Sequence, residues 1–535
     1  MNDRLIRSLT VVIFVILFIL GMSNISGYGL PIDEPTEQRI LLMNIKEYSE
    51  IAGISLRNPV FNGIKRISES IEQDHGIAAY YLFTPILMFT GLDSLTCMYV
   101  WHVYTYLLWF LGVIALYAIL KEIARNRWTP LIGILLYFFT PRMYAEGHYN
   151  NKDIVLLSLV LIMLAFAVRI VKRWKDRDII GFAIASGFLM NCKIIGIAIW
   201  GLTGLFAIGY VFREFGKTQQ GKRFSDLGLS AILSLIIFFV LTPAMWRLPV
   251  GYIQYCISNA TRFSRWDGSF LFHGNTVTPM SMGIPRTYLL QWILITTPVY
   301  IIVLFLSSIV IFAIDVYKKM GQKGESRNVT GDRRGFYTLF ILTFLFPVVT
   351  AVIKAPTLVL YNGWRHNYYL YAYVLLCSCY SVDRILDGGL VWDCRYKTAR
   401  LIMSGLVVIG FSVTLFDMIS HRSYEYMYFN PITRKLVDVE GFEGDYWNVA
   451  ELPVLEEFAR QYNDVVTVAH KGYASTGQFK NIQVGNLKIV SESDESDFYI
   501  YNTWMMRDKS ELADYDKVYS FEKYGHEMYA IFQKK

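Results

Sequence analysis

The sequence predicts a polytopic α-helical membrane protein of about eleven transmembrane helices, followed by a small C-terminal α/β domain. Three observations predict this fold class. The 535-residue chain is 54% hydrophobic with a mean hydropathy of +0.35, whereas soluble proteins average about 45–50% apolar residues. Several apolar runs reach the roughly 18–20 residues that cross a bilayer. Near residue 420 the long apolar runs end and a mixed composition begins.

The predicted spans are apolar runs that lack the charges of the connectors between them. The fifth and tenth of them are shorter than a bilayer requires. In chain order they are 5–22, 95–120, 129–145, 154–171, 179–192, 194–212, 227–246, 287–314, 336–353, 367–382 and 400–418.

Basic residues predict the orientation of these spans. The N-terminus and alternate connectors are rich in Lys and Arg, as at Lys172-Arg173 and Arg333-Arg334, and such connectors stay in the cytoplasm. The N-terminus is therefore expected in the cytoplasm. Loops 23–94, 145–153, 247–286 and 354–366, and all residues after about 420, are expected outside. No small-residue cleavage site follows the first span, so we interpret it as retained.

The charge balance and the cysteines exclude two other classes of protein. The net charge is +7, yet residues 421–535 carry more Asp and Glu than Lys and Arg, so the basic excess belongs to the cytoplasmic connectors. Anionic lipid explains such a distribution and no nucleic acid is needed. Six scattered cysteines with no CxxC or zinc spacing give no disulfide framework.

The two predicted domains are residues 1–420 in the membrane and residues 421–535 outside it. In the second domain we expect a helix over 451–462, strands over 465–470 and 498–502, and a strand pair over 517–532 that turns near Tyr524-Gly525. In the outer loop 23–94, apolar spacing over 36–76 predicts helices on the membrane surface, and 77–90 is interpreted as interfacial or re-entrant. The aromatic, basic loop 247–286 is either an interfacial belt or a cover over a substrate cleft.

Polar residues on the predicted outer face supply the candidate site. The acidic pair Asp33-Glu34 follows the first span. The loop before the fourth span contains His148, Asn151 and Asp153. The remaining candidates stand at the outer ends of other spans, and they are Lys193, Tyr361, Arg365 and His366.

These residue types suit sugar transfer from a lipid phosphate. A carboxylate can deprotonate an attacking hydroxyl, and Lys and Arg bind a leaving phosphate. Each residue also has a structural interpretation. Asp153 stands where a residue caps a helix, Lys193 could snorkel to the interface, and Arg365-His366 could anchor a helix end in headgroups. His148 and His273 are more often plain polar loop residues than metal ligands.

Several motifs resemble those of the GT-C glycosyltransferases, within the bacterial type of the family 39 branch of protein O-mannosyltransferases and aminoarabinose transferases. Ile-Asp-Glu-Pro at 32–35 resembles the branch's first-loop acidic motif, and 140–153 is similar to its second loop. Asn-Cys-Lys-Ile-Ile-Gly at 191–196 resembles its Lys-centred turn. The segments 285–298, 360–366, 424–431 and 445–447 are similar to bacterial members.

The resemblance implies roles for these residues. Asp33 would be the catalytic base, with Glu34 beside it. Asp153 would shape the donor or acceptor pocket, and Lys193 and Arg365 would face the lipid phosphate. The chain departs from the family in three respects: it has no β-trefoil insertion near 247–286, Asn362 stands where relatives often have an acid, and the second loop has no Asp-x-Asp. Metal use therefore stays open, with a divalent metal as a possibility and no certain cofactor.

The sequence therefore predicts a glycosyltransferase of the inner membrane or of an ER-type membrane. Its donor would be a sugar on an undecaprenyl- or dolichyl-type phosphate, and its acceptor a lipid, a glycan or a protein. Two alternatives come from other classes. A transporter or flippase of a lipid-linked saccharide predicts inverted repeats and broken paired helices, which we do not find in the sequence. A membrane-anchored assembly protein explains the C-terminal domain but not four polar groups on one face.

Overall fold

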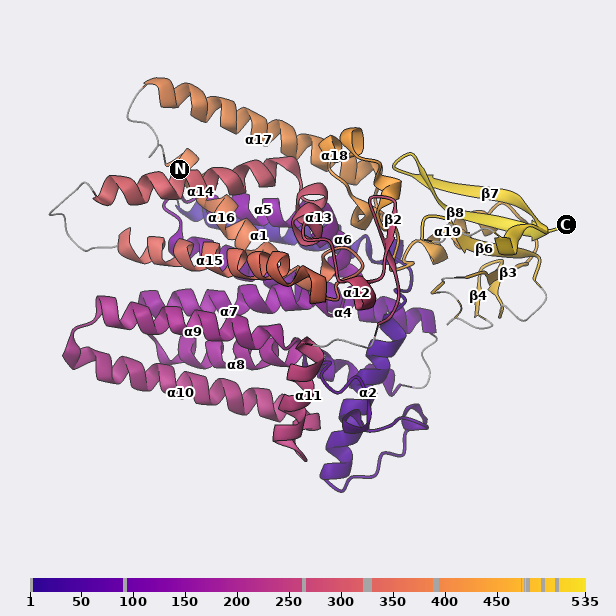
Figure 1. The fold of residues 1–535 in the computed structure, drawn as a ribbon, viewed down its shortest axis with the longest axis horizontal. Helices are drawn as coiled ribbons and strands as arrows, with labels where there is room; N and C mark the ends of the chain where they lie inside the picture. Colours follow the sequence, from indigo (N-terminus) through magenta and orange to yellow (C-terminus); the bar gives the residue numbers. More distant parts are fainter. Residues whose placement is uncertain are drawn as a thin grey trace.

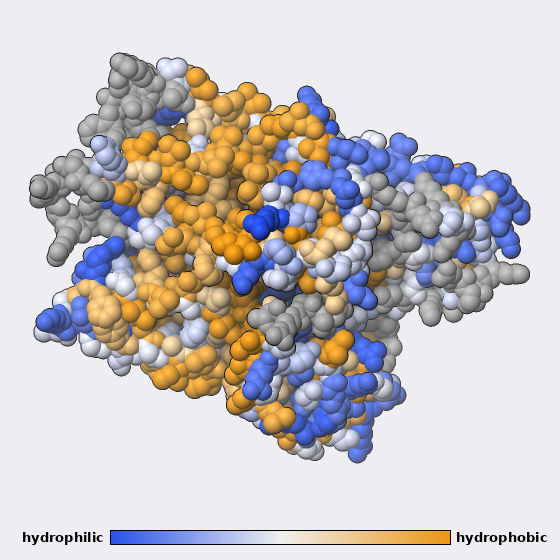
Figure 2. All heavy atoms as spheres, viewed as in Figure 1, coloured by the Kyte–Doolittle hydropathy of each residue, from blue (hydrophilic) through white to orange (hydrophobic). Residues whose placement is uncertain are grey.

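A long bundle of helices carries a sheet domain and several short elements at one end (Figure 1). The computed structural model describes residues 3–89, 94–261, 266–320, 330–387, 394–472, 474–475, 477, 482–491, 496–505 and 510–535. Figure 2 shows hydrophobic residues over the visible face of the bundle and hydrophilic residues over the sheet domain. We call the end of the bundle that carries the sheet domain the sheet end.

Eight helices in the described ranges are long and apolar enough to cross a membrane. Each overlaps one of the predicted spans, so the prediction of a polytopic helical membrane protein is confirmed. The eight are α1 (Asp3–Met22), α4 (Ser94–Ile123), α7 (Asp153–Arg173), α9 (Ile195–Glu214), α10 (Lys217–Leu241), α14 (Val299–Met320), α15 (Thr330–Lys354) and α17 (Cys394–Ser420).

The three other predicted spans are shorter helices that do not meet the length and hydropathy of a span. The run 129–145 breaks before Pro141, where proline cannot continue the hydrogen-bond ladder, and gives α5 (Thr129–Phe138) and α6 (Pro141–Tyr149). The other two, which pack inside the bundle, are α8 (Asp176–Cys192) and α16 (Leu370–Leu386). The eighth predicted span breaks at Pro298, which separates α13 (Tyr288–Thr296) from α14.

Short elements cover the sheet end of the bundle (Figure 1). The predicted surface helix after the first span is a single helix, and the segment 77–90 forms only short turns of helix. The aromatic loop 247–286 contributes one helix, one short helix and a hairpin. These elements are α2 (Glu34–Ile51), the 3₁₀ helix η4 (Ala78–Phe83), α3 (Thr84–Leu87), α11 (Pro249–Thr261), β1 (Phe270–Phe272), β2 (Asn275–Val277) and α12 (Pro279–Met282).

The C-terminal region forms a six-stranded mixed sheet in the order β4-β5-β3-β6-β8-β7. Strand β3 runs parallel to β5 and β6, and the remaining pairs are antiparallel. The predicted strands and the hairpin at Tyr524-Gly525 are found. The elements are α18 (Pro431–Leu436), α19 (Glu451–Ala459), β3 (Val466–His470), β4 (Ile482–Val484), β5 (Leu487–Ile489), β6 (Phe498–Asn502), β7 (Tyr515–Lys523) and β8 (His526–Lys534).

The segment between α17 and the sheet packs onto the helical body. The Asn430 side chain donates hydrogen bonds to the carbonyl oxygens of Leu294, Ile295 and Thr297, where α13 gives way to α14. Residues 424–430 are buried. The domain boundary at 420/421 stays a prediction, since this packing continues the helical body beyond it.

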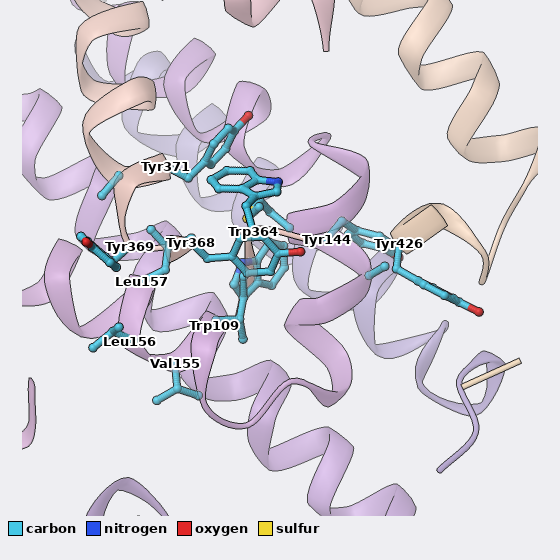
Figure 3. Packing of buried hydrophobic residues seen from close by; sticks show 14 of the residues in the cluster. Trp109, Tyr144, Val155, Leu156, Leu157, Trp364, Tyr368, Tyr369, Tyr371 and Tyr426 are labelled. Carbon is cyan, nitrogen blue, oxygen red and sulfur yellow. The ribbon is translucent and has the colours of Figure 1, made fainter. Parts of the chain in front are cut away.

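An aromatic core connects the middle of the bundle to the sheet end. The Trp364 indole packs edge-on to the rings of Tyr368 and Tyr371, with centroids 4.9 and 6.2 Å apart (Figure 3). The indole nitrogen of Trp364 donates to the Thr296 hydroxyl at 2.9 Å. Rigid aromatic packing of this kind fixes the chain immediately before α16, which matters because Arg365 and His366 follow Trp364 directly.

The N-terminus and the C-terminus lie at opposite ends of the molecule, and the C-terminus belongs to the sheet domain (Figure 1). Because the Lys/Arg-rich connectors predict a cytoplasmic N-terminus, we expect an alkaline phosphatase fused after Lys535 to be active, and the same reporter placed before Met1 to be inactive. A reporter that works only in the cytoplasm, such as a fluorescent protein, serves as the matched control. Activity of the phosphatase at the N-terminus and not at the C-terminus would reverse the orientation.

Candidate active site

The sequence folds locally so that Asp33 is available at the mouth of a cleft. Asp33 occupies the N-cap position of α2, where an Asp side chain commonly accepts a backbone hydrogen bond, but it makes no such bond. Pro35 lies in the first turn of the helix and has no N–H to offer. The Asp33 side chain is about half exposed, at 47%, and its Oδ2 lies 3.2 Å from Arg365 Nη1. The carboxylate therefore faces the cleft and not its own helix.

Asp153 begins α7 and is buried. The capping role that its position suggested belongs to Asn150, whose side-chain oxygen accepts from the Asp153 backbone N–H at 2.8 Å. The Asp153 carboxylate instead pairs with Lys193, and its Oδ2 lies 3.7 Å from Arg365 Nη1. Asp153 thus links the Lys193 turn between α8 and α9 to the Arg365 turn before α16.

One cleft at the sheet end gathers most of the candidate residues. It has a volume of about 420 Å³. Of the candidates from the sequence, Asp33, Asp153, Lys193, Tyr361, Arg365 and His366 line it. Their segments lie up to 333 positions apart in the chain, so the fold brings them together.

The remaining three candidates lie outside the cleft lining. Glu34 is buried and accepts from His102 Nε2 at 2.9 Å and from the Gln38 amide at 3.0 Å. His148 is buried, and its two ring nitrogens lie 2.8 Å from the Tyr144 carbonyl oxygen and 3.1 Å from that of Gly21. Asn151 is also buried. The structure therefore gives Glu34 and His148 structural contacts inside the protein and no contact with the cleft.

Several cleft residues were not selected from the sequence. Glu37 stands one helical turn after Asp33, so its position on the same face of α2 could have been inferred from the spacing. Lys152 was part of the second-loop motif but was not singled out. No pattern in the outer loop 23–94 indicated that Glu72 and His75 would line the cleft with Asp33. The lining residues in this group are Thr36, Glu37, Glu72, His75, Lys152, Trp266 and Asn362.

Charges in the cleft alternate between carboxylates and cations. Arg365 Nη1 reaches both Asp33 and Asp153, and Lys152 Nζ lies 3.4 Å from Glu37 Oε1. Although burial opposes it, the carboxylates of Asp33 and Asp153 hold the pKa of Arg365 above its ordinary value. Burial lowers the pKa of Lys193, and Asp153 counteracts that effect. The cleft is therefore an ion network in which each cation has a carboxylate within reach.

Four buried polar atoms in the cleft residues have no hydrogen bond among the described residues: Glu37 Oε2, His75 Nδ1, Arg365 Nε and His366 Nε2. Of these, His75 Nδ1 lies 3.0 Å from Glu72 Oε2. Burial, together with the charges of Lys193 and Arg365, holds the pKa of His366 well below its usual value, so its ring is neutral. Since buried polar groups in native proteins nearly always have partners, the other three atoms are ready to bind the polar groups of a ligand.

The cover of the cleft is aromatic. Trp266 from the loop 247–286 stacks on Tyr361, with ring centroids 3.9 Å apart and planes 15° apart. Of the two interpretations of this loop, Trp266 supports the cover. The basic residues Arg262 and Arg265 of the same loop lie outside the described residues.

An apolar groove of about 220 Å³ lies between α9 and α15. Two of its lining residues are near cleft residues in the chain: Ile195 is two positions from Lys193, and Leu360 is next to Tyr361. An apolar cavity of about 340 Å³ is lined mainly by α7, α9, α10 and α15, with Trp200, Phe336 and Phe340 in its wall. The bundle thus contains apolar space, and part of it is lined by chain neighbours of the cleft residues.

The described residues offer no obvious metal site. No group of three or more His, Cys, Asp and Glu side chains that could hold a metal ion occurs among them. In the cleft, the carboxylates of Asp33, Glu37 and Asp153 each have a Lys or Arg partner. These residues fit an anion with polar substituents better than they fit a divalent cation.

The burial of Asp153 predicts an asymmetry in stability. Asp153→Asn removes the charge that faces both Lys193 and Arg365 in a buried site, and breaking a buried pair costs about 3–5 kcal/mol. Asp33→Asn removes a half-exposed partner, for which about 0–1 kcal/mol is typical. Thermal unfolding in detergent should therefore show a larger loss for Asp153→Asn. Equal losses would mean that Asp153 is not the buried centre of the network.

Comparison with known proteins gives a likeness to solved structures but none to a family or a curated sequence. No protein-family model and no curated protein sequence matches the chain. Among solved structures, the chain is similar to that of ArnT from Cupriavidus metallidurans bound to undecaprenyl phosphate, with 13% sequence identity, a TM-score of 0.46 and coverage of 97% of each chain.

Proposed function

We propose that this protein is a glycosyltransferase that moves a sugar from a polyprenyl phosphate to an acceptor hydroxyl at the sheet end of the bundle. The observation that carries the proposal is a polar cleft of carboxylates and cations whose residues Lys193 and Tyr361 stand next to or near residues that line an apolar groove between α9 and α15. A lipid-linked phosphosugar has the same division: a charged, hydroxyl-rich head on an apolar tail. The motifs that resemble family 39 glycosyltransferases support the same conclusion.

The phosphate of the donor would lie against Lys193 and Arg365. Arg binds phosphate through two parallel hydrogen bonds, and Lys supplies a point charge. Arg365 Nε, which has no partner in the described structure, would donate together with Nη2, the terminal nitrogen on its side of the guanidinium, in such a pair of bonds. Neutral His366 would contribute its unpaired Nε2 nearby. The tail would then enter the apolar groove, which begins beside these residues.

Asp33 would act as the general base. Its carboxylate takes the proton of an acceptor hydroxyl, whose oxygen attacks the anomeric carbon of the sugar. The bond from that carbon to the phosphate oxygen breaks at the same time, and the polyprenyl phosphate leaves with the bonding electrons. A single displacement of this kind inverts the anomeric centre.

Arg365 connects the two roles. Its guanidinium faces Asp33 at 3.2 Å. A donor phosphate would compete with the Asp33 carboxylate for this guanidinium, so donor binding would leave that carboxylate available to the acceptor hydroxyl.

The cleft residues on α2 would contact the sugar or the acceptor. Glu37 Oε2 is buried and unpaired in the described structure, and Lys152 lies beside its other oxygen. A carboxylate oxygen in this position can accept hydrogen bonds from two hydroxyls. The chemical identity of the sugar and of the acceptor does not follow from these contacts.

The base is tested by Asp33→Asn, which preserves shape and removes basicity. We expect transfer to fall by about 10²-fold or more, with normal expression and unfolding temperature because the side chain is half exposed. Glu34→Gln is the matched control next to it in the chain, and its activity should stay far above that of Asp33→Asn, since Glu34 does not line the cleft. Near-wild-type turnover by Asp33→Asn would contradict the mechanism.

The phosphate contacts are tested by titration of the donor at saturating acceptor. A hydrogen bond to a charged group is worth about 1.5–3 kcal/mol, so Lys193→Ala and Arg365→Ala should each raise the donor KM by about tenfold to a hundredfold. Arg365→Lys should restore this only in part, because the planar fork is lost. If both Ala variants keep the wild-type donor KM, the phosphate binds elsewhere.

The groove predicts a dependence on the length of the lipid. Ala198 is exposed and lines the groove, so Ala198→Trp should fill it and raise KM for a long polyprenyl donor while leaving a short-chain donor nearly unaffected. Ile409→Trp places the same side chain on the exposed face of α17 and should change neither value. An equal effect of Ala198→Trp on long and short donors would show that the tail does not use this groove.

A further inference from the structure

The segment 443–449 lies between the C-terminal sheet and the cleft, and we call it the bracket. Its side chains are buried: Glu443 is 2% exposed and Trp447 is 4% exposed. Neither residue lines the cleft. Glu443 nevertheless contacts the turn before Arg365, and Trp447 contacts both Arg365 and the loop that leads to Asp33.

The bracket holds the turn before Arg365. Glu443 Oε2 accepts a hydrogen bond from the Gly363 backbone N–H at 3.0 Å, and the Gly363 carbonyl oxygen accepts from the Tyr288 hydroxyl at 2.9 Å. Asn362 and Gly363 both have positive φ, at 55° and 67°, a conformation that costs free energy for asparagine unless its surroundings impose it. Glu443 and Tyr288 therefore hold the backbone of this turn from both sides.

Trp447 holds the side chain at the end of the same turn. The Arg365 guanidinium carbon lies 4.5 Å from the centroid of the Trp447 ring. A cation over an indole face is attracted by the negative face of the ring, and more strongly in a buried site than in water. The indole thus restrains the guanidinium between Asp33 and Asp153.

The bracket also holds the loop that leads to Asp33. The Gly29 backbone N–H donates to the Val449 carbonyl oxygen at 2.7 Å, and the Ile32 backbone N–H donates to the Trp447 carbonyl oxygen at 3.0 Å. These bonds fix the chain one residue before Asp33. The bracket therefore makes hydrogen bonds to the loop that leads to Asp33 and a ring contact with the Arg365 guanidinium.

The sheet domain in turn holds the bracket. The Asp445 carboxylate accepts from the backbone N–H groups of Val449 and Ala450 and, at 3.0 Å, from the Tyr529 hydroxyl on β8. The Asn502 amide on β6 donates to the Asp445 carbonyl oxygen at 3.1 Å. Contacts therefore run without a break from the sheet, through the bracket, to the cleft.

We propose that Glu443 and Trp447 are positioning residues through which the C-terminal sheet sets the distance between Asp33 and Arg365. They act on the reaction only through the two loops that they hold. The sheet domain would then have a role at the cleft. The expected effect on donor KM rests on the proposed function, whereas the expected effect on hydrogen exchange does not.

The structural consequence is tested by hydrogen exchange on the full-length protein in detergent. Glu443→Ala should raise the exchange of backbone amides in 360–367 and 29–33 relative to wild type, because held backbone exchanges slowly. Glu440→Ala is the matched control: its side chain is exposed, lies three residues earlier and pairs with His526. It should leave both segments unchanged. Unchanged exchange in Glu443→Ala, or an equal increase across the whole chain, would overturn the inference.

The kinetic consequence is tested by a double-mutant cycle. Glu443→Ala should raise the donor KM by roughly tenfold, with Glu443→Gln closer to wild type because it retains an acceptor oxygen. The effect should largely vanish in the Arg365→Ala background, since Glu443 acts through Arg365. Additive effects in this cycle would overturn the positioning role even if both variants are impaired.

The two tests separate the two proposals. If wild-type protein transfers no sugar from any polyprenyl donor, the proposed function fails, yet a local rise in exchange at 360–367 and 29–33 would still support the bracket. If Glu443→Ala does not fold, Glu443→Met takes its place in the exchange measurement, since it removes the acceptor oxygen and keeps a side chain of similar length at the buried site.

Discussion

The guanidinium of Arg365 between Asp33 and Asp153 is the interaction on which the rest of the site depends. Asp153 is buried and brings Lys193 with it. Asp33 is half exposed and faces the open cleft. A buried cation is tolerated only where carboxylates and hydrogen bonds compensate for its lost hydration. Four chain segments are therefore committed to one geometry at the sheet end of the bundle.

The fold was largely predictable because its signals are local. Long apolar runs such as 154–171 and 400–418 predict spans by length alone, and the short aromatic and apolar run 498–502 predicts a buried strand. The count of spans was less predictable. Proline at 141 and 298 breaks two runs, and the helix Leu370–Leu386 is apolar because it is buried among other helices. An apolar run does not distinguish lipid from protein as its surroundings.

The site was predictable in part, because some of its residues stand at the ends of the predicted spans. Asp33, Asp153, Lys193 and Arg365 stood out because charged residues at span ends are costly unless they have a role. Glu34 and His148 stood out equally, but the fold turns them to partners inside the protein. Glu72, His75 and the bracket residue Glu443 could not be selected, since their proximity to the cleft depends on loop conformation and on a sheet hundreds of residues away. Trp447 stood in the 445–447 motif, but its contact with Arg365 could not be inferred from it.

The central claim is that the charged cleft at the sheet end transfers a sugar from a polyprenyl phosphate. The most direct measurement incubates purified protein with a panel of polyprenyl-phosphate sugars, each labelled in the sugar, and with membrane extract as the source of acceptors. The account predicts that label from at least one donor moves to an acceptor and that Asp33→Asn abolishes nearly all of this movement. No transfer from any donor, or transfer that Asp33→Asn leaves intact, would contradict it.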